Sequence, residues 1–201
     1  MERPKVVPIM KLETKRLILR DFVADDWQRV LEYQSDPLYL RYYHWEERTP
    51  EAVKEFVRRF LDHQQQEPRT KFQLAAVLKS NGLLIGNCGV RMEYIGAEEA
   101  EIGYEFDPKY WNHGYATEAA HVMVDYGFST LDVHRIWAAC VADNTGSAHV
   151  LEKLGMKLEG RFREHRYYKN RWWDSLYYAI LEDEWKVHKQ IQPVQWKKLE
   201  G

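Results

Sequence analysis

The chain has little of what marks several large classes of protein. It contains two cysteines, Cys88 and Cys140, among 201 residues, too few for a disulfide framework or a cysteine-based metal site. No apolar run reaches the roughly 18 residues of a transmembrane helix, and no signal-peptide pattern is present. We therefore expect a cytoplasmic protein that binds no membrane, with both cysteines as thiols in the core.

Neither sign of charge is in excess. The 29 Lys and Arg residues and 31 Asp and Glu residues give a formal net charge of -2, so no global field attracts nucleic acid. The hydrophobic fraction of 45% and the aromatic fraction of 14% suffice for a full core. We expect one globular domain that binds no nucleic acid.

Apolar periodicity and turn signals divide the chain into short strands and helices. The expected strands cover 14–22, 71–79, 83–92, 99–106, 135–141 and a hairpin from 157 onward. The expected helices cover 24–35, a segment beginning at 49–51, 115–130 and 144–154, with an aromatic loop at 36–50 before the second helix. This order predicts a mixed α/β fold. We interpret 1–12 as an N-terminal extension, 13–185 as the domain and 186–201 as a C-terminal tail.

The stretch YWNHGYATEAA, residues 110–120, joins a strand to an Ala-rich helix. A turn at Gly114 followed by a helix start exposes backbone N–H groups beside the positive end of the helix dipole, which is an anion site. No P-loop motif and no G-x-G-x-x-G opening a helix is present, which disfavours ATP and dinucleotides. The pattern predicts another phosphate-bearing ligand.

The same stretch resembles a known cofactor loop. W-N-H-G-Y-A is similar to the pyrophosphate loop Gln/Arg-x-x-Gly-x-Gly/Ala of the GNAT superfamily of N-acetyltransferases, with Trp111 in place of Gln/Arg. LETKRLILRDF, EIGYEF, YATEAA and NTGSAHVLEKLGMKLEG, then DSLYYAIL, resemble its RimJ/RimL-like branch over about residues 10–185. The resemblance implies one GNAT-like domain with a mixed, mostly antiparallel sheet flanked by helices. Its fourth and fifth strands would splay to admit the pantetheine arm of acetyl-CoA.

The resemblance also implies where acetyl-CoA binds, with no metal. The backbone N–H groups that would wrap its pyrophosphate belong to Asn112, His113, Gly114, Tyr115 and Ala116. The His113 side chain either adds charge there or is solvated. Asn144 caps the next helix and, by the resemblance, contacts pantetheine as well.

Acyl transfer to an amine needs a neutral amine, stabilisation of the oxyanion and a proton for the leaving thiolate. Many members of the superfamily place a tyrosine acid on the helix after Asn144, but the matching position here is Leu151. Ser147, one helical turn earlier, matches the RimL-like pattern and is our candidate acid. A first-turn hydrogen bond is the alternative role for Ser147.

The candidate bases are carboxylates. Glu101 and Glu105 alternate onto one face of the strand 99–106; Glu101 is the first choice, and solvated or cross-strand pairing is the alternative. A functional Glu that RimL-like enzymes carry after L-E-G is replaced here by Arg166, and Glu164 is a further candidate. Glu118, inside the helix after the loop, is interpreted as structural.

The amine acceptor would bind between an aromatic loop and the C-terminal hairpin. The candidate contacts are Tyr42, Tyr43, Trp45, Arg166 and Tyr168. Aromatic residues there suit an apolar or cationic group, or alternatively the surface of a homodimer. An α-amine, with a pKa of about 7.7 to 8.0, is partly neutral near pH 7, whereas a lysine amine costs about 4 to 5 kcal/mol to deprotonate. We therefore favour peptide amino termini. Small-molecule amines such as polyamines, amino sugars or antibiotics, and a non-catalytic acyl-CoA-binding module, remain the alternatives.

Overall fold

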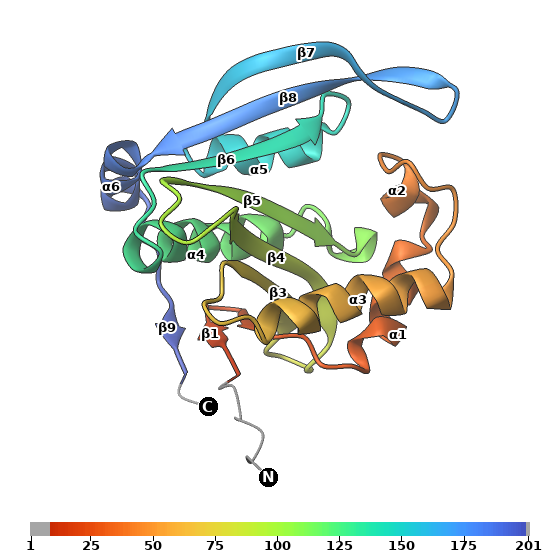
Figure 1. Cartoon of the computed structure of the whole chain (residues 1–201), viewed down its shortest axis with the longest axis horizontal. Coiled ribbons are helices and arrows are strands. Elements are labelled where there is room, and N and C mark those ends of the chain that lie inside the picture. Colours follow the sequence, from red (N-terminus) through yellow and green to blue (C-terminus); the bar gives the residue numbers. More distant parts are fainter. Residues whose placement is uncertain (1–8, 200–201) are drawn as a thin grey trace.

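The computed structural model describes residues 9–199. Within this range nine strands form one sheet in the order β7-β8-β6-β5-β4-β3-β2-β1-β9 (Figure 1). The strands are β1 (Lys11–Glu13), β2 (Leu17–Arg20), β3 (Lys71–Leu78), β4 (Leu84–Met92), β5 (Glu99–Phe106), β6 (Arg135–Val141), β7 (Lys157–Tyr168), β8 (Arg171–Leu181) and β9 (Lys197–Lys198). Only β5 and β6 pair in parallel. The predicted mixed, mostly antiparallel sheet is confirmed.

Helices cover both faces of this sheet. They are α1 (Asp26–Gln34), α2 (Pro37–Leu40), α3 (Pro50–Gln64), α4 (Tyr115–Thr130), α5 (Thr145–Lys153) and α6 (Glu182–Ile191), with a short 3-10 helix at Pro108–Tyr110. Thr49 caps α3, the helix predicted to begin at 49–51, its hydroxyl accepting from the Ala52 N–H at 3.2 Å. No helix within residues 9–199 is long and apolar enough to cross a membrane.

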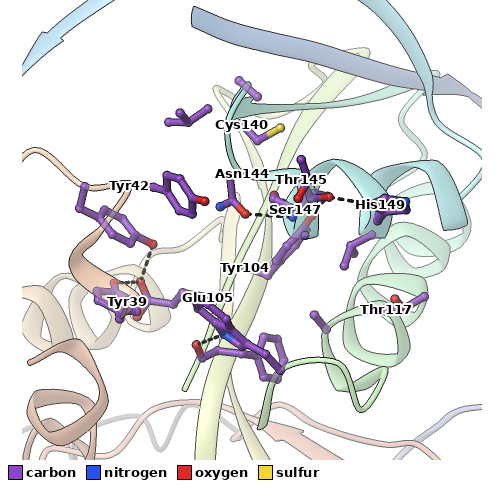
Figure 2. A pocket seen from close by; sticks show the side chains of 18 of the residues that line it. Tyr39, Tyr42, Tyr104, Glu105, Thr117, Cys140, Asn144, Thr145, Ser147 and His149 are labelled. Carbon is purple, nitrogen blue, oxygen red and sulfur yellow. Dashed lines mark hydrogen bonds between the residues drawn. The ribbon is translucent and has the colours of Figure 1, made fainter. Parts of the chain in front are cut away.

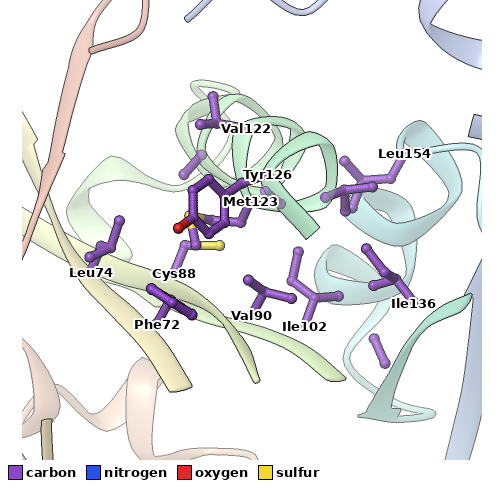
Figure 3. Packing of buried hydrophobic residues seen from close by; sticks show 14 of the residues in the cluster. Phe72, Leu74, Cys88, Val90, Ile102, Val122, Met123, Tyr126, Ile136 and Leu154 are labelled. Carbon is purple, nitrogen blue, oxygen red and sulfur yellow. The ribbon is translucent and has the colours of Figure 1, made fainter. Parts of the chain in front are cut away.

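The core lies on the two sides of β3 and β4. Because successive side chains of a strand point to opposite faces, Leu74 and Ala76 pack with α4, whereas Ala75 and Val77 pack with α1 and α3. Figure 3 shows Met123 of α4 directly above this layer. Burial on both faces explains why β3 is almost continuously apolar.

The sheet splays between β5 and β6. The two strands pair at Glu99–Glu101 against Arg135–Trp137 and nowhere further along. Beyond these three pairs each strand continues with its other neighbour only, β5 with β4 and β6 with β8. This is the splay expected between the fourth and fifth predicted strands, and it is confirmed.

Two expectations near the N-terminus need correction. The predicted strand 14–22 is present only as β2, Leu17–Arg20, because residues 14–16 form the turn after β1, which the Thr14 hydroxyl closes by accepting from the Leu17 N–H at 2.8 Å. The predicted loop 36–50 contains α2, because Asp36 caps a new helix by accepting from the Leu38 N–H. Asp36-Pro37 therefore ends one helix and begins the next.

The ordered fold extends past the predicted limits 13 and 185 of the domain. At the C-terminal end, α6 continues to Ile191, and β9 pairs with β1, which begins at Lys11. The carboxylate of Asp125 in α4 accepts from the indoles of Trp185 and Trp196, each at 2.9 Å. These contacts attach the C-terminal segment to α4. Residues 1–8 of the predicted extension and 200–201 of the predicted tail lie outside the described residues.

Candidate active site

A cavity of about 780 Å³ lies along the splay between β5 and β6. Its walls come from residues 39–44 at the end of α2 and just after it (the α2 segment), β5, the loop before α4, β6, α5 and the β7–β8 hairpin. In Figure 2, Tyr39 and Tyr42 lie on one side of it and Ser147 and His149 of α5 on the other. The volume is in the range of small-molecule sites.

One end of the cavity is the N-terminus of α4. Gly114 precedes the helix with φ +76°, a left-handed conformation that side chains strain. Among residues 9–199, none accepts a hydrogen bond from the backbone N–H groups of 112–117. These free donors and the positive end of the helix dipole form an anion site.

Arg16 holds this loop from the β1–β2 turn. Its guanidinium donates to the His113 carbonyl at 2.8 Å and to Glu118 at 2.6 Å, and the Thr14 hydroxyl also donates to Glu118. Burial by itself would raise the pKa of Glu118, but the hydrogen bonds from Thr14 and Arg16 outweigh it and lower the pKa. Glu118 thus anchors the loop to the N-terminal hairpin, outside the cavity lining.

Four of the five predicted loop residues line the cavity: Asn112, Gly114, Tyr115 and Ala116. His113 does not, because its ring bonds to the Trp111 carbonyl at 2.6 Å and stacks on Tyr115. The Trp111 indole donates to the carbonyl of Phe106 at 2.8 Å. This bond fastens the loop to the end of β5.

The start of α5 forms the middle of the cavity. Asn144 caps the helix as predicted, its side-chain oxygen accepting from the Ser147 N–H at 3.1 Å. The Tyr104 hydroxyl lies 2.9 Å from the Ser147 carbonyl and 3.1 Å from its hydroxyl. Burial raises the pKa of Tyr104, so its hydroxyl stays protonated. Leu151, where the superfamily pattern has tyrosine, is buried in the core.

The two cysteines differ in position. Cys88 is fully buried beneath α4, as expected of a core thiol. Cys140 of β6 lines the cavity beside α5 (Figure 2), so the expectation of two core thiols holds for Cys88 only. Burial raises the pKa of Cys140 to about 11, with a smaller opposing effect from Ser147. Both side chains are therefore thiols at neutral pH.

Glu105 of β5 is the only carboxylate among the cavity-lining residues of the described chain. Its Oε1 accepts from Tyr33 at 2.8 Å, Gln34 at 2.8 Å and Asn87 at 2.9 Å, and its Oε2 from Tyr39 at 2.6 Å and Tyr43 at 3.4 Å. Burial, followed by the charge on Glu105, raises the pKa of all three tyrosines. The Glu105 carboxylate thus lies among protonated tyrosine hydroxyls and side-chain amides at the end of the cavity beside α2, the α2 end.

The other two candidate bases lie elsewhere. Glu101 pairs with Arg91 at 3.3 Å and does not line the cavity. Glu164 lies in a bulge of β7, with φ +50°, where residues 163–165 face the single Asp174. Its backbone N–H donates to Asp174, and its side chain is exposed outside the cavity lining.

The end of the cavity beside α2 and the β7–β8 hairpin contains four of the five residues expected to bind the acceptor: Tyr42, Tyr43, Arg166 and Tyr168. Trp45 does not line the cavity but stacks on Tyr43 with ring centroids 4.7 Å apart. The Tyr168 hydroxyl donates to the Tyr42 carbonyl at 2.9 Å, so the β7–β8 hairpin is tied to the α2 segment.

Sequence reasoning missed Tyr104 and the residues that hold Glu105. Strand alternation puts Tyr104 on the face opposite Glu105, yet both line the cavity. Beyond Glu101 the strand has lost its β6 neighbour, so both of its faces border the open edge. A signal did exist for Asn87, a polar residue inside the apolar run LLIGNCGV.

Comparisons with known proteins agree with this geometry. The model of the acetyltransferase (GNAT) domain matches residues 16–157. The uncharacterized N-acetyltransferase YnaD of Bacillus subtilis (strain 168) is 40% identical over 178 residues, covering 88% of this chain and 99% of YnaD. The crystal structure of a GNAT-family acetyltransferase from Bacillus anthracis has a TM-score of 0.75 and 37% identity, covering 87% of this chain and 99% of that one.

A more distant structure shares the fold. Spermidine N-acetyltransferase from Vibrio cholerae, solved with CoA and spermine, has a TM-score of 0.71 at 19% identity and covers 85% of this chain and 98% of that one. Since the family model spans most of the chain and a close relative covers nearly its whole length, the protein belongs to the GNAT superfamily and is an acyl-CoA-dependent N-acetyltransferase.

Proposed function

We propose that this enzyme transfers the acetyl group of acetyl-CoA directly to a primary amine, favouring an α-amine such as a peptide amino terminus, in the cytoplasm. We also place it in the RimJ/RimL-like branch, on the motifs quoted above. The observation that carries the proposal is one continuous cavity. It has unpaired backbone N–H groups at the α4 end and a single carboxylate, Glu105, at the α2 end.

The α4 end suits the pyrophosphate of acetyl-CoA. The N–H groups of 112–117 would donate to its oxygens, and Gly114 leaves the main chain open to their approach. The splayed edges of β5 and β6 offer unpaired backbone groups to the pantetheine amides. Asn144 and Ser147 line the same stretch. The cosubstrate supplies an activated acetyl group, and the chain supplies its placement.

We assign removal of the amine proton to Glu105. Five groups donate to Glu105, whereas a carboxylate has only about four lone-pair sites. An incoming group must therefore displace one of the five donors. The Tyr43 hydroxyl at 3.4 Å is the most distant donor and the first to give way. The proton would then reach Glu105 through that position, directly or by way of a water molecule.

We assign the proton for the leaving thiolate to Ser147, with Tyr104 as its positioning residue. The Tyr104 hydroxyl donates to the Ser147 carbonyl at 2.9 Å, so the Tyr104 oxygen, 3.1 Å from the Ser147 hydroxyl, is an acceptor for the serine proton. The raised pKa of Tyr104 keeps its hydroxyl protonated, and its bond to the carbonyl holds the first turn of α5 against β5. Ser147 would donate to sulfur by turning its O–H from the Tyr104 oxygen to the thiolate.

The preference for an α-amine follows from how few carboxylates are available to remove a proton from the acceptor. One carboxylate lines the acceptor end of the described cavity, and it already receives five hydrogen bonds. Deprotonating an α-amine, which is partly neutral near pH 7, costs less free energy than deprotonating a lysine side chain, so a weak base suffices.

We further propose that two copies associate through the β7–β8 hairpin. Phe162, Tyr167 and Trp172 are each more than half exposed there, and β7 is an edge strand of the described sheet. Sedimentation of the wild type and of Trp172→Ser would test it. A wild-type monomer at micromolar concentration would contradict the dimer.

The test of function is release of free CoA thiol from acetyl-CoA across peptide amino termini, lysine peptides, polyamines and aminoglycosides. We expect turnover with α-amines and slower turnover with lysine peptides. Failure of acetyl-CoA to bind in calorimetry would overturn the assignment of the α4 end, and turnover confined to lysine would overturn the α-amine preference.

A further inference from the structure

Arg166 lies in the wall of the cavity and has no ion-pair partner among residues 9–199. Its side chain is exposed to the cavity, and no described carboxylate forms an ion pair or hydrogen bond with it. On the hairpin, Arg161 is paired with Asp174 at 2.7 Å and Arg171 with Asp143. Arg163 also has no ion pair or hydrogen bond with a described residue, but it lies outside the cavity lining. Arg166 is thus the unpaired guanidinium of the described hairpin that faces the cavity, and its five donors are available for a ligand.

The fold holds Arg166 in this place. It follows the bulge of β7 and lies opposite Trp173 of β8, which is buried. Two residues later Tyr168 stacks on Trp173 with centroids 5.0 Å apart, and its hydroxyl binds the α2 segment. The strand is thus fixed on both sides of the cavity mouth, and because the bulge shifts the register, it decides which β7 side chains face inward.

The charges along the cavity separate into two ends. A lysine of the cavity lining, Lys153, lies at the C-terminal end of α5, where its carbonyl contacts His121 of α4. Lys153 therefore belongs to the coenzyme side. At the acceptor end of the described cavity the charged groups are Glu105 on β5 and Arg166 on β7, across the splay from each other.

We infer that the acceptor is a primary amine that itself carries a carboxylate, with the amine toward Glu105 and the carboxylate bound by Arg166. The inference rests on the proposed function and narrows its acceptor. Arginine forms paired, charge-assisted hydrogen bonds with carboxylates, which fix a ligand in register. A polyamine or aminoglycoside has several ammonium groups and would place one of them against an unpaired guanidinium, which costs binding energy. Free α-amino acids and peptides with an acidic first residue share the required chemistry.

The experiment compares acceptors that differ only in this charge. One pair is leucine and leucinamide, and the other is a pair of tripeptide amides beginning with Asp or Asn; spermidine is the polycationic reference. The ratio of kcat/KM for the acid over the amide is measured at saturating acetyl-CoA for wild type, Arg166→Gln, Arg166→Lys and the control Arg163→Gln. Arg163 is an exposed arginine of the same strand outside the cavity lining, so its loss changes the net charge equally.

We expect the wild type to favour at least one acid over its amide by about 10- to 100-fold, the range of a charge-assisted hydrogen-bond pair. The ratio should fall to about 1 in Arg166→Gln, remain partly in Arg166→Lys and be unchanged in Arg163→Gln. The leucine pair and the Asp pair then separate a free amino acid from an acidic peptide.

Two results would overturn the inference while leaving the transferase assignment intact: a ratio that Arg166→Gln does not change, or turnover of spermidine above every acid. Acetyl-CoA binding with no turnover on any acid also counts against it. Absence of acetyl-CoA binding would instead remove the proposed function on which the inference depends. Unchanged acetyl-CoA affinity in Arg166→Gln verifies that the variant is folded.

Discussion

The two ends of the cavity are formed by different kinds of chemical group. The end that we propose for the coenzyme consists mainly of backbone N–H groups from one short stretch, 112–117, together with the first turn of α5. The end that we propose for the acceptor consists of side chains from segments far apart in the chain: the α2 segment, Glu105 of β5 and Arg166 of β7. A backbone site needs only a turn and a helix start, so it appears as a local motif. A side-chain site can be rebuilt by single substitutions, which lets one fold serve different acceptors.

The largest expected effect is at the acceptor end. Glu105→Gln removes the one carboxylate that the described residues contribute to the cavity lining and should lower kcat by about 100-fold, the usual contribution of a general base. Acetyl-CoA affinity should be unchanged, because Glu105 lies away from the 112–117 loop. Steady-state thiol release and calorimetry measure the two quantities.

Glu101→Gln is the matched control for Glu105→Gln. Glu101 lies on the same strand but pairs with Arg91 outside the cavity lining. Its replacement should leave kcat within about twofold. An equal loss of kcat in both variants would mean that replacing Glu105 disturbs strand β5 as a whole and does not remove a base from the cavity.

Ser147→Ala tests the junction of the two ends. We expect kcat to fall about 30-fold with little change in KM, less than for Glu105, because a thiol of pKa about 8.5 is a fair leaving group without help. Tyr104→Phe should have a smaller effect in the same direction, since it only positions Ser147. A larger loss in Tyr104→Phe than in Ser147→Ala would transfer the role of acid to Tyr104.

Gly114→Ala tests the coenzyme end. The left-handed φ of +76° costs an alanine about 1 kcal/mol, and relaxation of the loop should raise the KM for acetyl-CoA about 10-fold. The acceptor KM should not change. Gly82→Ala is the control, because Gly82 has φ +71° with open space around it in the β3–β4 turn. It should lose similar stability and retain coenzyme binding; if both variants bind acetyl-CoA normally, the loop does not hold the phosphates.

Glu118→Gln has the smallest expected effect and concerns the anchor of the coenzyme loop. The lowered pKa of Glu118 means that its stabilisation is present above the unfolded pKa, near 4.3, and is lost as pH falls through the folded value. We expect the free energy of unfolding in urea to drop by about 1 to 2 kcal/mol at pH 7. The difference from wild type should shrink below about pH 4. Glu55→Gln, on the exposed face of α3, should change nothing measurable; a constant difference for Glu118→Gln at all pH values would contradict an ionic role.

Most elements of the fold could be predicted from local patterns. The strand 99–106, the helix 115–130 and the strand 135–141 were predicted with the bounds that the structure has, because apolar periodicity is clear there. The strands β1 and β9 were not, since each depends on a partner strand. The short helix α2 was not predicted either, although its cap Asp36 and the following Pro37 are local signals. The acidic first turn of α6, Glu182 to Glu184, was a helix signal in the sequence that went unused.

The candidate site shows the same division. Gly114, Asn144 and Ser147 follow from a loop motif and a helix cap, which are local. Strand alternation placed Glu101 and Glu105 on one face and could not choose between them, because it does not show which part of β5 has lost its β6 neighbour. The five donors around Glu105 come from α1, the α2 segment and β4.

By itself, the sequence determined the order of the longer strands and helices between residues 17 and 181, the turn at Gly114 and the resemblance to the superfamily, because periodicity, capping and turn chemistry act over a few residues. The tertiary structure alone decided which carboxylate enters the cavity and that Arg166 faces it unpaired. Those outcomes depend on where β5 separates from β6 and on the bulge that sets the register of β7, and both are consequences of long-range strand pairing.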